Sequence, residues 1–490
     1  MTAPTVEYSV VAPLLVVFGG AVAGVAVEAL VSRRRRYPVQ LALSAGSLMA
    51  AFVAVLSVAG ARQVAVMGAV AIDGPALFAQ GLLLVLALLA LLVIADRGVD
   101  SLTPLGAGAV QTAVFPLALF AVGGMMLFAS AADLLTMFIA LEVLSLPLYL
   151  LCGLARHRRI LSREAALKYF LLGAFSSALF LYGIALLYGA TATLSLRHIA
   201  QHSAHTPTVL VGSGLLVVGV LFKVGVIPFH SWVPDVYQGA PASVVALMAG
   251  ATKVAAFCAM LRIFSSALPN LVSDWRPLLS TAAALSMVLG AVLAVTQRDV
   301  KRMLGYSAVA QAGFLLLGVV AAGAAGVSST LFYLAAYGFS VVGAFAVVGL
   351  VRSGATEGAP EATDLDQWAG LGRRSPVVAT VFAVFLLAFA GIPLTSGFVG
   401  KFAVFEAAAA EGLWSLVVVG VLASAVAAFV YARIIVVMFF AEATAQQPAV
   451  AQPGRLTEIA VTAAAAVTVG VGVLPQPLLD VAGQVGGFVG

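Results

Sequence analysis

Charged residues are scarce in this chain of 490 residues. Only 9% of its residues are Asp, Glu, Lys or Arg, whereas soluble globular domains average about 25%. Hydrophobic residues make up 62% of the chain, and its mean hydropathy is +1.12. A chain with so few polar groups cannot cover itself with a water-soluble surface. The composition therefore excludes a soluble enzyme or binding domain and predicts an integral membrane protein whose solvent is lipid.

Cofactor motifs are also lacking. Cys152 and Cys258 lie in separate apolar stretches, and neither belongs to a CxxC or Cys/His pattern that could hold zinc or an iron–sulfur cluster. No glycine-rich nucleotide-binding motif is found. We therefore expect no redox centre, metal or nucleotide in this chain. The net charge of +5 is spread over short loops, so it does not indicate nucleic-acid binding.

Apolar stretches of about 20 residues, long enough to cross a bilayer, recur along the chain. The first is too long for a signal peptide and lacks a basic leader, so we expect it to be retained as a helix. The sequence predicts a single all-α, polytopic membrane domain. Its fourteen predicted segments are 9–31, 38–60, 75–95, 108–129, 131–155, 164–190, 208–238, 240–264, 276–296, 302–322, 327–352, 376–410, 413–440 and 457–476.

Segments seven and twelve are long and are predicted to be broken. Segment seven contains Pro228, and segment twelve contains Gly391 and Pro393. Proline frees backbone groups of a membrane helix, which is tolerable only where protein or water satisfies them. An Ile-Pro dipeptide occurs at both breaks, 165 residues apart, although chance recurrence is common in so biased a composition.

Five spans separate the two breaks, so the breaks fall in blocks of opposite orientation, formed by segments four to eight and nine to thirteen. Interrupted helices at matching positions in the two halves of a membrane protein indicate a central transport site. We therefore divide the domain into N-terminal helices 1–105, repeat one 106–267, repeat two 268–440 and a C-terminal helix 441–490.

Basic residues gather in the loops after odd-numbered segments. The loops after even-numbered segments hold only Arg62, Arg197 and Arg276. By the positive-inside rule the odd-numbered loops are cytoplasmic, and both termini are expected on the outer side. The basic residues of the odd-numbered loops are Arg33–Arg36, Arg97, Arg156, Arg158, Arg159, Arg163, Arg298, Lys301, Arg302, Arg352, Arg373, Arg374 and Arg455.

Lysine is rarer than arginine and is distributed differently. Lys301 is interpreted as a cytoplasmic loop charge, but the other lysines fall inside apolar segments. Arginine stays protonated under almost all conditions, whereas a desolvated lysine can release its proton. The lysines inside the segments are therefore candidate proton carriers. The five lysines of the chain are Lys168, Lys223, Lys253, Lys301 and Lys401.

Placing a charge near the bilayer centre costs about 2.5–3.5 kcal/mol, so such groups normally face a partner or a hydrated cavity. The alternative is that a lysine reaches the membrane surface from a helix end. This alternative is strongest for Lys168, near the start of its segment. It is weaker for Lys223 and Lys253, deep in theirs, and for Lys401, beyond the break.

Four other groups lie inside the spans. Glu142, in the middle of segment five, has no opposite charge on its own helix turn, and a nearby lysine would hold it ionised. His230 could bridge lysines or be a buried structural histidine. Arg433 and Glu406 could act in transport, packing or an interface.

Several motifs carry a family resemblance. The stretches Leu141–Tyr149 and Glu164–Phe170 resemble the fifth and sixth helices of antiporter-like membrane subunits. Phe222–Pro241 is similar to their broken seventh helix, and Ser396–Phe402 to the twelfth. The chain as a whole is similar to the subunit N family of proton-translocating NADH–quinone oxidoreductase, respiratory complex I. The sequence Asp235–Pro241 favours this family over subunits L and M.

The resemblance implies about fourteen helices in two inverted five-helix repeats, each contributing half a proton channel. It implies that Glu142 and Lys223 are a coupling pair, Lys253 a central relay, Lys401 a distal inlet or outlet, and Lys168 a member of the same polar axis.

It further implies a multi-pass subunit of the bacterial inner membrane, in contact with subunit M, small membrane subunits and lipid. The complex would be a translocase whose NADH, FMN, iron–sulfur clusters and quinone are bound by partner subunits. Two other functions remain open: an Mrp-type cation/proton antiporter subunit and a passive scaffold, although a scaffold leaves the intramembrane lysines unexplained.

Overall fold

The computed structural model describes residues 6–96, 111–154, 159–202, 205–354, 359–442 and 449–489. Three arginines expected in cytoplasmic loops, Arg97, Arg156 and Arg158, lie outside the described residues. The same holds for the boundary predicted near residue 105 and for the ends of segments four and five at 108–110 and 155.

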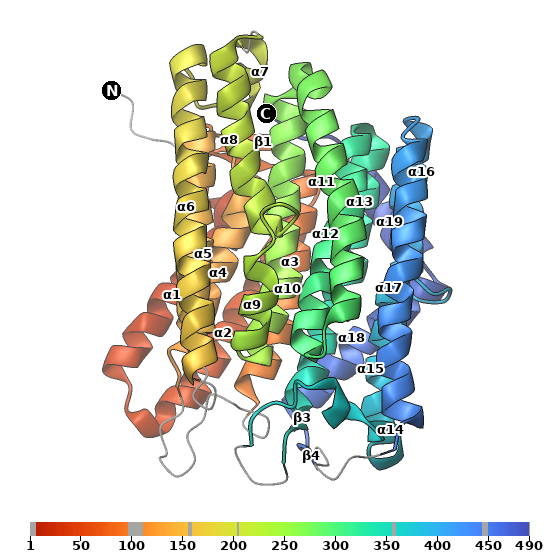
Figure 1. Cartoon of the computed structure of the whole chain (residues 1–490). Helices are drawn as coiled ribbons and strands as arrows, with labels where there is room; N and C mark the ends of the chain where they lie inside the picture. Colours follow the sequence, from red (N-terminus) through yellow and green to blue (C-terminus); the bar gives the residue numbers. More distant parts are fainter. Residues whose placement is uncertain are drawn as a thin grey trace.

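Helices form most of the molecule, and the long ones run along a common direction (Figure 1). In the first half they are α1 (Tyr8–Leu30), α2 (Arg33–Ser57), α3 (Gly74–Ala95), α4 (Val114–Ser130), α5 (Leu134–Cys152), α6 (Arg159–Thr191), α7 (Leu196–His202), α8 (Pro207–Val224), α9 (Trp232–Gly239) and α10 (Ala242–Arg262). In the second half they are η1 (Ile263–Ala267), η2 (Pro269–Leu271), α11 (Val272–Thr296), α12 (Val300–Ala321), α13 (Gly323–Leu350), η3 (Leu365–Trp368), α14 (Leu371–Arg374), α15 (Pro376–Ala390), α16 (Ser396–Ala410), α17 (Trp414–Phe440), α18 (Arg455–Val473) and α19 (Gln476–Gln484).

Twelve of the described helices are long and apolar enough to cross a membrane, and α4 and α15 are shorter apolar helices. Each predicted segment coincides with one long helix, except that segments seven and twelve are each divided between two helices. The predicted all-α, polytopic membrane fold is therefore confirmed. The number of fourteen crossings and the inverted repeats stay predictions.

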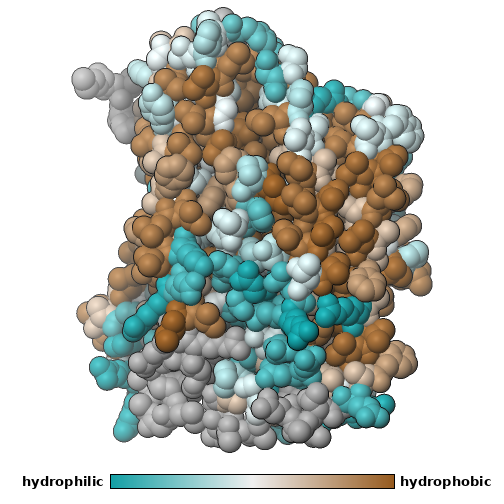
Figure 2. Space-filling model, viewed as in Figure 1, coloured by the Kyte–Doolittle hydropathy of each residue, from teal (hydrophilic) through white to brown (hydrophobic). Residues whose placement is uncertain are grey.

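Three helices form the centre of the bundle. Buried residues make up all of the most apolar window of α10 and 94% of those of α12 and α13. The helices around them, among them α1, α6 and α17, bury one side and expose large apolar residues on the other, as expected for a surface that contacts lipid. Figure 2 shows this apolar surface over much of the visible face.

Both predicted breaks are present. The helix α8 ends at Val224, followed by Gly225 with φ +74°, and α15 ends at Ala390, followed by Gly391 with φ +78°. Glycine adopts this left-handed conformation without steric cost, so it ends the first half-helix and redirects the chain. The second halves, α9 and α16, begin at Trp232 and Ser396. The terminal carbonyls of α8 and α15 therefore point into the protein interior.

Strands are short and lie at the helix ends. The strands β1 (Gln63–Ala65) and β2 (Val70–Ile72) form an antiparallel hairpin in which Val64 pairs with Ala71. The strands β3 (Val351–Arg352) and β4 (Ala449–Val450) pair antiparallel near α14, at the opposite end of the bundle (Figure 1).

The two ends of the described chain approach the β1–β2 region. Glu7 accepts a hydrogen bond from the backbone N–H of Val66, and the guanidinium of Arg62 donates to the carbonyl of Gly487. The two chain ends therefore lie at the same end of the bundle, which an even number of crossings requires.

Candidate functional site

Lys223 occupies the last turn of α8, just before the first break, and its side chain is buried. Its Nζ donates to Ser145 Oγ of α5 at 2.8 Å and to the Tyr169 hydroxyl of α6 at 3.2 Å. Trp232, the first residue of α9, stacks on Tyr169 and donates its indole N–H to the carbonyl of Phe222. Residues on both sides of the break thus hold the lysine in a hydroxyl-lined site.

Glu142 lies on α5, one helical turn before Ser145. Its Oε1 is buried without a hydrogen-bond partner in the described chain. Among the described residues no ion pair joins Glu142 to Lys223, since the ammonium bonds to Ser145 and Tyr169 instead. Ser145, which binds Lys223, therefore lies one helical turn from Glu142 on the same helix. A buried acceptor without a donor is costly, so this oxygen is available to accept a hydrogen bond from a new partner.

Lys253 lies in the middle of α10, the most buried helix, and is 3% exposed. Its Nζ donates to the carbonyl of Val224 at 3.1 Å and to that of Ala308 on α12 at 2.9 Å. The ammonium also lies over the ring of Tyr337, 6.0 Å from its centroid. Val224 is the last residue of α8, so Lys253 caps the negative end of the broken helix.

Lys401, in the helix α16 that follows the second break, also binds carbonyls at the end of a half-helix. Its Nζ donates to the carbonyls of Phe389 and Ala390, at 2.9 and 3.0 Å, and to Ser424 Oγ of α17 at 2.8 Å. It lies 4.6 Å from the ring centroid of Phe314. Phe389 and Ala390 end α15, so both central lysines are bound by the carbonyl end of a broken helix.

Two polar residues of α12 lie near the lysine sites, and they were not anticipated from the sequence. Ser307 and Gln311 are one turn apart on the helix that provides the Ala308 carbonyl. Ser307 hydrogen bonds to the Tyr431 hydroxyl at 2.5 Å, and Gln311 Nε2 donates to the Phe389 carbonyl at 2.9 Å. Their spacing of four residues in an apolar helix was the available signal. We call Glu142, Ser145, Lys223, Lys253, Ser307, Gln311, Tyr431 and Lys401 the polar path.

Lys168 lies away from this interior. Its side chain is 42% exposed and its Nζ forms ion pairs with Glu164 and Asp235, both at 2.7 Å. Asp235 of α9 also accepts from Arg302 of α12 at 2.5 Å. These four residues form an ionic cluster that links α6, α9 and α12. Figure 2 shows hydrophilic surface in the lower half of this face, bordered by apolar surface.

His230 lies in the segment between α8 and α9 and is half-buried. Its ring is 6.3 Å from that of Tyr306, and its Nδ1 is buried with no hydrogen-bond partner in the described residues. No contact with a lysine is found among the described residues, so the bridging role stays a prediction.

The interpretation of Lys301 as a loop charge is wrong. This lysine is in the first turn of α12, is 1% exposed, and pairs with Glu361 at 2.6 Å. It also donates to the carbonyl of Ala240, while Glu361 accepts from the backbone N–H of Ala242. The carboxylate comes from the loop that follows β3, 60 residues away, so no local pattern could reveal the pair.

The pH dependence of this ion pair can be tested. Burial alone would raise the pKa of Glu361, but the charges of Lys301 and Arg352 and the hydrogen bonds from Lys301 and Ala242 outweigh it and lower the pKa below its usual value. The folded state then binds protons less readily than the unfolded state. The stabilisation is therefore complete above the ordinary carboxyl range and is lost as the pH falls below about 4.3.

We expect Glu361→Gln to lower the free energy of unfolding by about 1–3 kcal/mol at neutral pH. The difference from wild type should begin to shrink at about pH 4, where the carboxyl of the unfolded chain takes up a proton, and should vanish below the lowered pKa of the folded carboxyl. Thermal unfolding of the purified chain, measured from neutral pH to below pH 4, gives the loss of stability and its dependence on pH. Glu411→Gln is the matched control, because Glu411 pairs with Arg276 at 48% exposure and should have little effect. A difference that is constant with pH would contradict the assignment.

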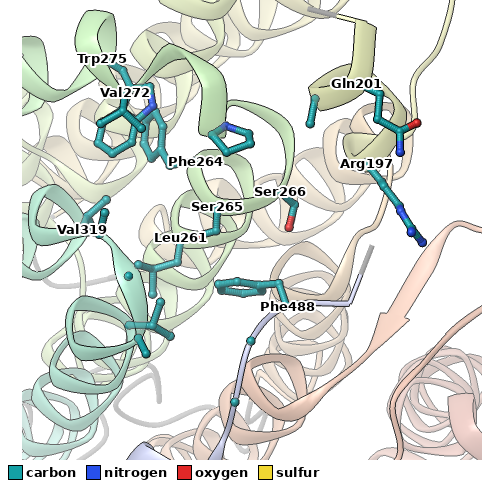
Figure 3. Close-up of a pocket in the computed structure, with 18 residues that line it drawn as sticks. Arg197, Gln201, Leu261, Phe264, Ser265, Ser266, Val272, Trp275, Val319 and Phe488 are labelled. Carbon is teal, nitrogen blue, oxygen red and sulfur yellow. The ribbon is translucent and has the colours of Figure 1, made fainter.

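A second buried ion pair was also missed. Arg262 at the end of α10 donates to both carboxylate oxygens of Asp73 at 2.8 Å, and both side chains are at most 1% exposed. The chain end completes this site, because the backbone N–H of Val489 donates to Asp73 and the Phe488 ring lies 4.9 Å from the guanidinium. Phe488 and Leu261 line a cavity of about 570 Å³. Figure 3 shows these side chains on the same side of the cavity.

The remaining candidate residues lie outside the polar path and make packing or surface contacts. The Cys152 thiol contacts Met248 at 4.0 Å, and both cysteines are buried. Arg433 donates to the carbonyl of Val295, whereas Glu406 is exposed on the outside of α16. In the described parts of the chain, no group of three His, Cys, Asp or Glu side chains is placed to hold a metal ion.

Comparison with known proteins identifies the family. The family described as NADH:quinone oxidoreductase/Mrp antiporter matches residues 131–427. The chain is 57% identical to NADH-quinone oxidoreductase subunit N of Rhodococcus opacus, with 99% of this chain and 97% of the relative covered. It is 53% identical to subunit N of Mycobacterium tuberculosis, with coverage of 99% and 98%. The chain belongs to the subunit N family of NADH-quinone oxidoreductase.

Solved structures agree with this family. A chain of respiratory complex I from Thermus thermophilus is 33% identical, with a TM-score of 0.81 over 96% of this chain and 99% of that one. A chain of the Mrp complex from Dietzia sp. has a TM-score of 0.84 over 98% and 97%, but only 22% identity. The second likeness shows a shared fold alone. The antiporter-like, multi-pass membrane subunit expected from the sequence motifs is thereby confirmed.

Proposed function

We propose that this chain is a proton-translocating membrane subunit of NADH–quinone oxidoreductase. Protons would move along the polar path, driven by quinone reduction in other subunits. The observation that supports this proposal most directly is the set of buried lysines at the carbonyl ends of both broken helices, with hydroxyl and amide groups beside them in an otherwise apolar interior. A cost of about 2.5–3.5 kcal/mol for each such charge is explained if the charge has a function.

In the first step, Glu142 and Lys223 exchange a proton through Ser145. The ammonium donates to Ser145 Oγ, whose hydroxyl donates to the Leu141 carbonyl of its own helix. Rotation of that hydroxyl toward the unpaired Glu142 oxygen would pass a proton to the carboxylate. The coupling pair then has two states, one with the groups in contact and one, seen here, with Lys223 bound to Ser145 and Tyr169.

In the central step, Lys253 exchanges protons with groups on both sides, those near the first broken helix and those along α12. Lys223 is adjacent to Val224, whose carbonyl binds Lys253, and Lys253 also binds the carbonyl of Ala308, next to Ser307. Ser307 and Gln311 then lead to Phe389, whose carbonyl is shared by Gln311 and Lys401. Lys401 would be the distal inlet or outlet, with Ser424 beside it.

We assign Lys168 and His230 to the periphery of the polar path. Lys168 belongs to the ionic cluster that holds α9 against α6 and α12, and His230 has a free buried Nδ1 beside the first break. Both could exchange protons with water or with a neighbouring subunit at the predicted cytoplasmic side, where the loops after odd-numbered segments lie.

The repeat organisation belongs to the same proposal. Glycine-terminated breaks after Val224 and Ala390, each capped by a buried lysine, support two five-helix units over 106–267 and 268–440, preceded by 1–105 and followed by 441–490. Both termini would face the outer side of a bacterial inner membrane. Partner subunits, including subunit M and small membrane subunits, would bind NADH, FMN, iron–sulfur clusters and quinone, and together form the translocase.

An Mrp-type cation/proton antiporter subunit is the alternative function. It shares the fold but not a comparable sequence likeness, since identity is 22% to the Mrp chain and 33% to the complex I chain. No observation on the polar path favours sodium exchange, because lysine ammonium groups would repel a sodium ion.

The coupling role of Glu142 provides the test of this proposal. We expect Glu142→Gln to lower NADH-driven proton translocation in membrane vesicles by roughly tenfold or more, because the amide cannot take up a proton. The subunit should still assemble, since the carboxyl makes no ion pair in the described structure. Glu406→Gln, which removes an exposed carboxyl from a membrane helix away from the polar path, is the matched control. Wild-type translocation in a fully assembled Glu142→Gln enzyme would exclude the coupling pair.

A further inference from the structure

A groove of about 780 Å³ lies between α2, α3, α13 and α19, away from the polar path. Leu77 and Gly81 of α3 and Phe339 of α13 line its inner side. Its walls include Leu56 of α2 and Val481 of α19, which are 59% and 51% exposed. The groove therefore opens to the surroundings of the bundle, which for these membrane-spanning helices are the hydrocarbon chains of lipids.

An apolar groove of this kind does not stay empty in a bilayer. A void beside apolar side chains forfeits dispersion contacts, and a flexible hydrocarbon chain can fill it. The groove runs along α2 and α3, so its long direction lies along the membrane helices and hence along the lipid chains. An extended acyl chain is the occupant that this shape and chemistry fit.

Arg62 lies at the end of the groove, five residues after the last residue of α2. It is exposed, and within the described residues it has no carboxylate partner in ion-pair distance. Its guanidinium makes one long hydrogen bond, 3.3 Å, to the carbonyl of Gly487. A guanidinium just beyond the end of a membrane helix lies at headgroup depth, and its planar fork matches phosphate oxygens.

We propose that this groove binds an anionic phospholipid. One acyl chain lies between α2, α3 and α19, and the headgroup phosphate accepts hydrogen bonds from Arg62. Because α19 and Val485 form the other side of the groove, the bound lipid joins the N-terminal helices to the C-terminal segment. The inference rests on the membrane fold alone and does not depend on the proton-translocation proposal.

The test uses the purified full chain with phosphatidylglycerol and phosphatidylcholine that carry identical acyl chains, and native mass spectrometry counts the bound lipid. We expect the wild-type chain to prefer phosphatidylglycerol by roughly tenfold. Both headgroups carry a phosphate, but only phosphatidylglycerol has a net negative charge, because the choline cation of phosphatidylcholine opposes the charge of Arg62. Arg62→Gln should remove this preference, and should lower binding of phosphatidylcholine less than binding of phosphatidylglycerol, because the choline cation already offsets part of the attraction to Arg62. Arg62→Lys should retain part of it.

Gly81→Leu tests the acyl-chain half of the site. A Cβ at position 81 would lie 3.8 Å from Phe52 and Val55, an ordinary contact, so the leucine enters the groove without displacing backbone. It should lower the binding of both lipids several-fold. Gly46→Leu is the matched control, because a Cβ there has no neighbour within 4 Å and lies outside the groove. Val481→Trp, on exposed α19, blocks the same groove if the Gly81 variant does not fold.

Two results would overturn the proposal. One is a wild-type chain that shows no preference for phosphatidylglycerol, or an Arg62→Gln variant that keeps it. The other is lipid binding to Gly81→Leu and Val481→Trp that equals binding to Gly46→Leu. In the second case, the groove would be a docking surface for a protein neighbour.

Discussion

Replacement of Lys253 by methionine or by arginine is expected to reduce NADH-driven proton translocation by roughly a hundredfold, the lower range of what a positioned proton-transfer group contributes. Methionine has no proton to give. Arginine keeps the positive charge but does not release its proton. The two variants should therefore fail alike, although only one removes the charge.

The surroundings of Lys253 give the reason for so large an effect. Its ammonium is bound by two backbone carbonyls, those of Val224 and Ala308, and has no carboxylate partner among the described residues. A charge held only by neutral groups in an apolar interior is expensive. A lysine can avoid this cost by giving up its proton, whereas an arginine cannot. Lys253 is also the only lysine that contacts both the first broken helix and α12 in the described structure.

The measurement compares acidification of membrane vesicles on NADH addition with the amount of assembled complex. NADH oxidation by a water-soluble electron acceptor reports whether the redox subunits remain attached. Thr252→Val is the matched control, because the hydroxyl of this buried neighbour bonds to the Met248 carbonyl of its own helix and lies off the polar path. Translocation at the wild-type rate by an assembled Lys253→Arg enzyme would mean that no protonation change occurs at this position.

Much of the fold could be predicted from the sequence because one continuous apolar stretch of sufficient length is enough to identify a membrane helix. Length and hydropathy located the spans, and Pro228 and Gly391 located both breaks. Lysines deep in the spans were also recognisable one residue at a time, since any ionisable group at that depth is unusual. The burial of Lys223, Lys253 and Lys401 agrees with that expectation.

The partners of these groups could not be predicted, because they come from distant segments. Asp73 and Arg262 are 189 residues apart, and Glu361 reaches Lys301 from a polar loop. Similarly, only packing of α12 against α17 brings Ser307 to Tyr431. Lys301 was misinterpreted because the sequence placed it at a helix end and gave no sign of the loop that covers it.

The ion pair between Asp73 and Arg262 is expected to be the most sensitive site for stability. We expect Asp73→Ala to lower the free energy of unfolding by about 3–5 kcal/mol, a large part of the 5–15 kcal/mol typical of a folded protein, because it leaves an unpaired guanidinium in a buried position. The change also removes the N-cap of α3, where Asp73 accepts from the backbone N–H of Ala76. The chain end is released as well, since the backbone N–H of Val489 loses its acceptor.

Asp133→Ala separates these contributions. Asp133 is the N-cap of α5 and accepts from the backbone N–H of Thr136, but it has no ion pair in the described structure. Its loss should cost only about 1 kcal/mol. The difference in the free energy of unfolding between Asp73→Ala and Asp133→Ala then measures the cost of leaving Arg262 unpaired and of releasing the chain end. Thermal unfolding of each purified variant measures its loss of stability. The abundance of the variant in the membrane provides an independent check.

A double replacement determines whether the buried charge is the cause. In Asp73→Asn with Arg262→Met, no charge remains, the asparagine can still cap α3, and the methionine fills much of the arginine's volume. Replacing a buried pair by neutral groups is often nearly neutral for stability, whereas removing one partner is not. The double variant should therefore be markedly more stable than Asp73→Ala. Equal instability of the two would assign the effect to lost packing around the chain end, where Phe488 contacts the arginine, and not to the unpaired charge.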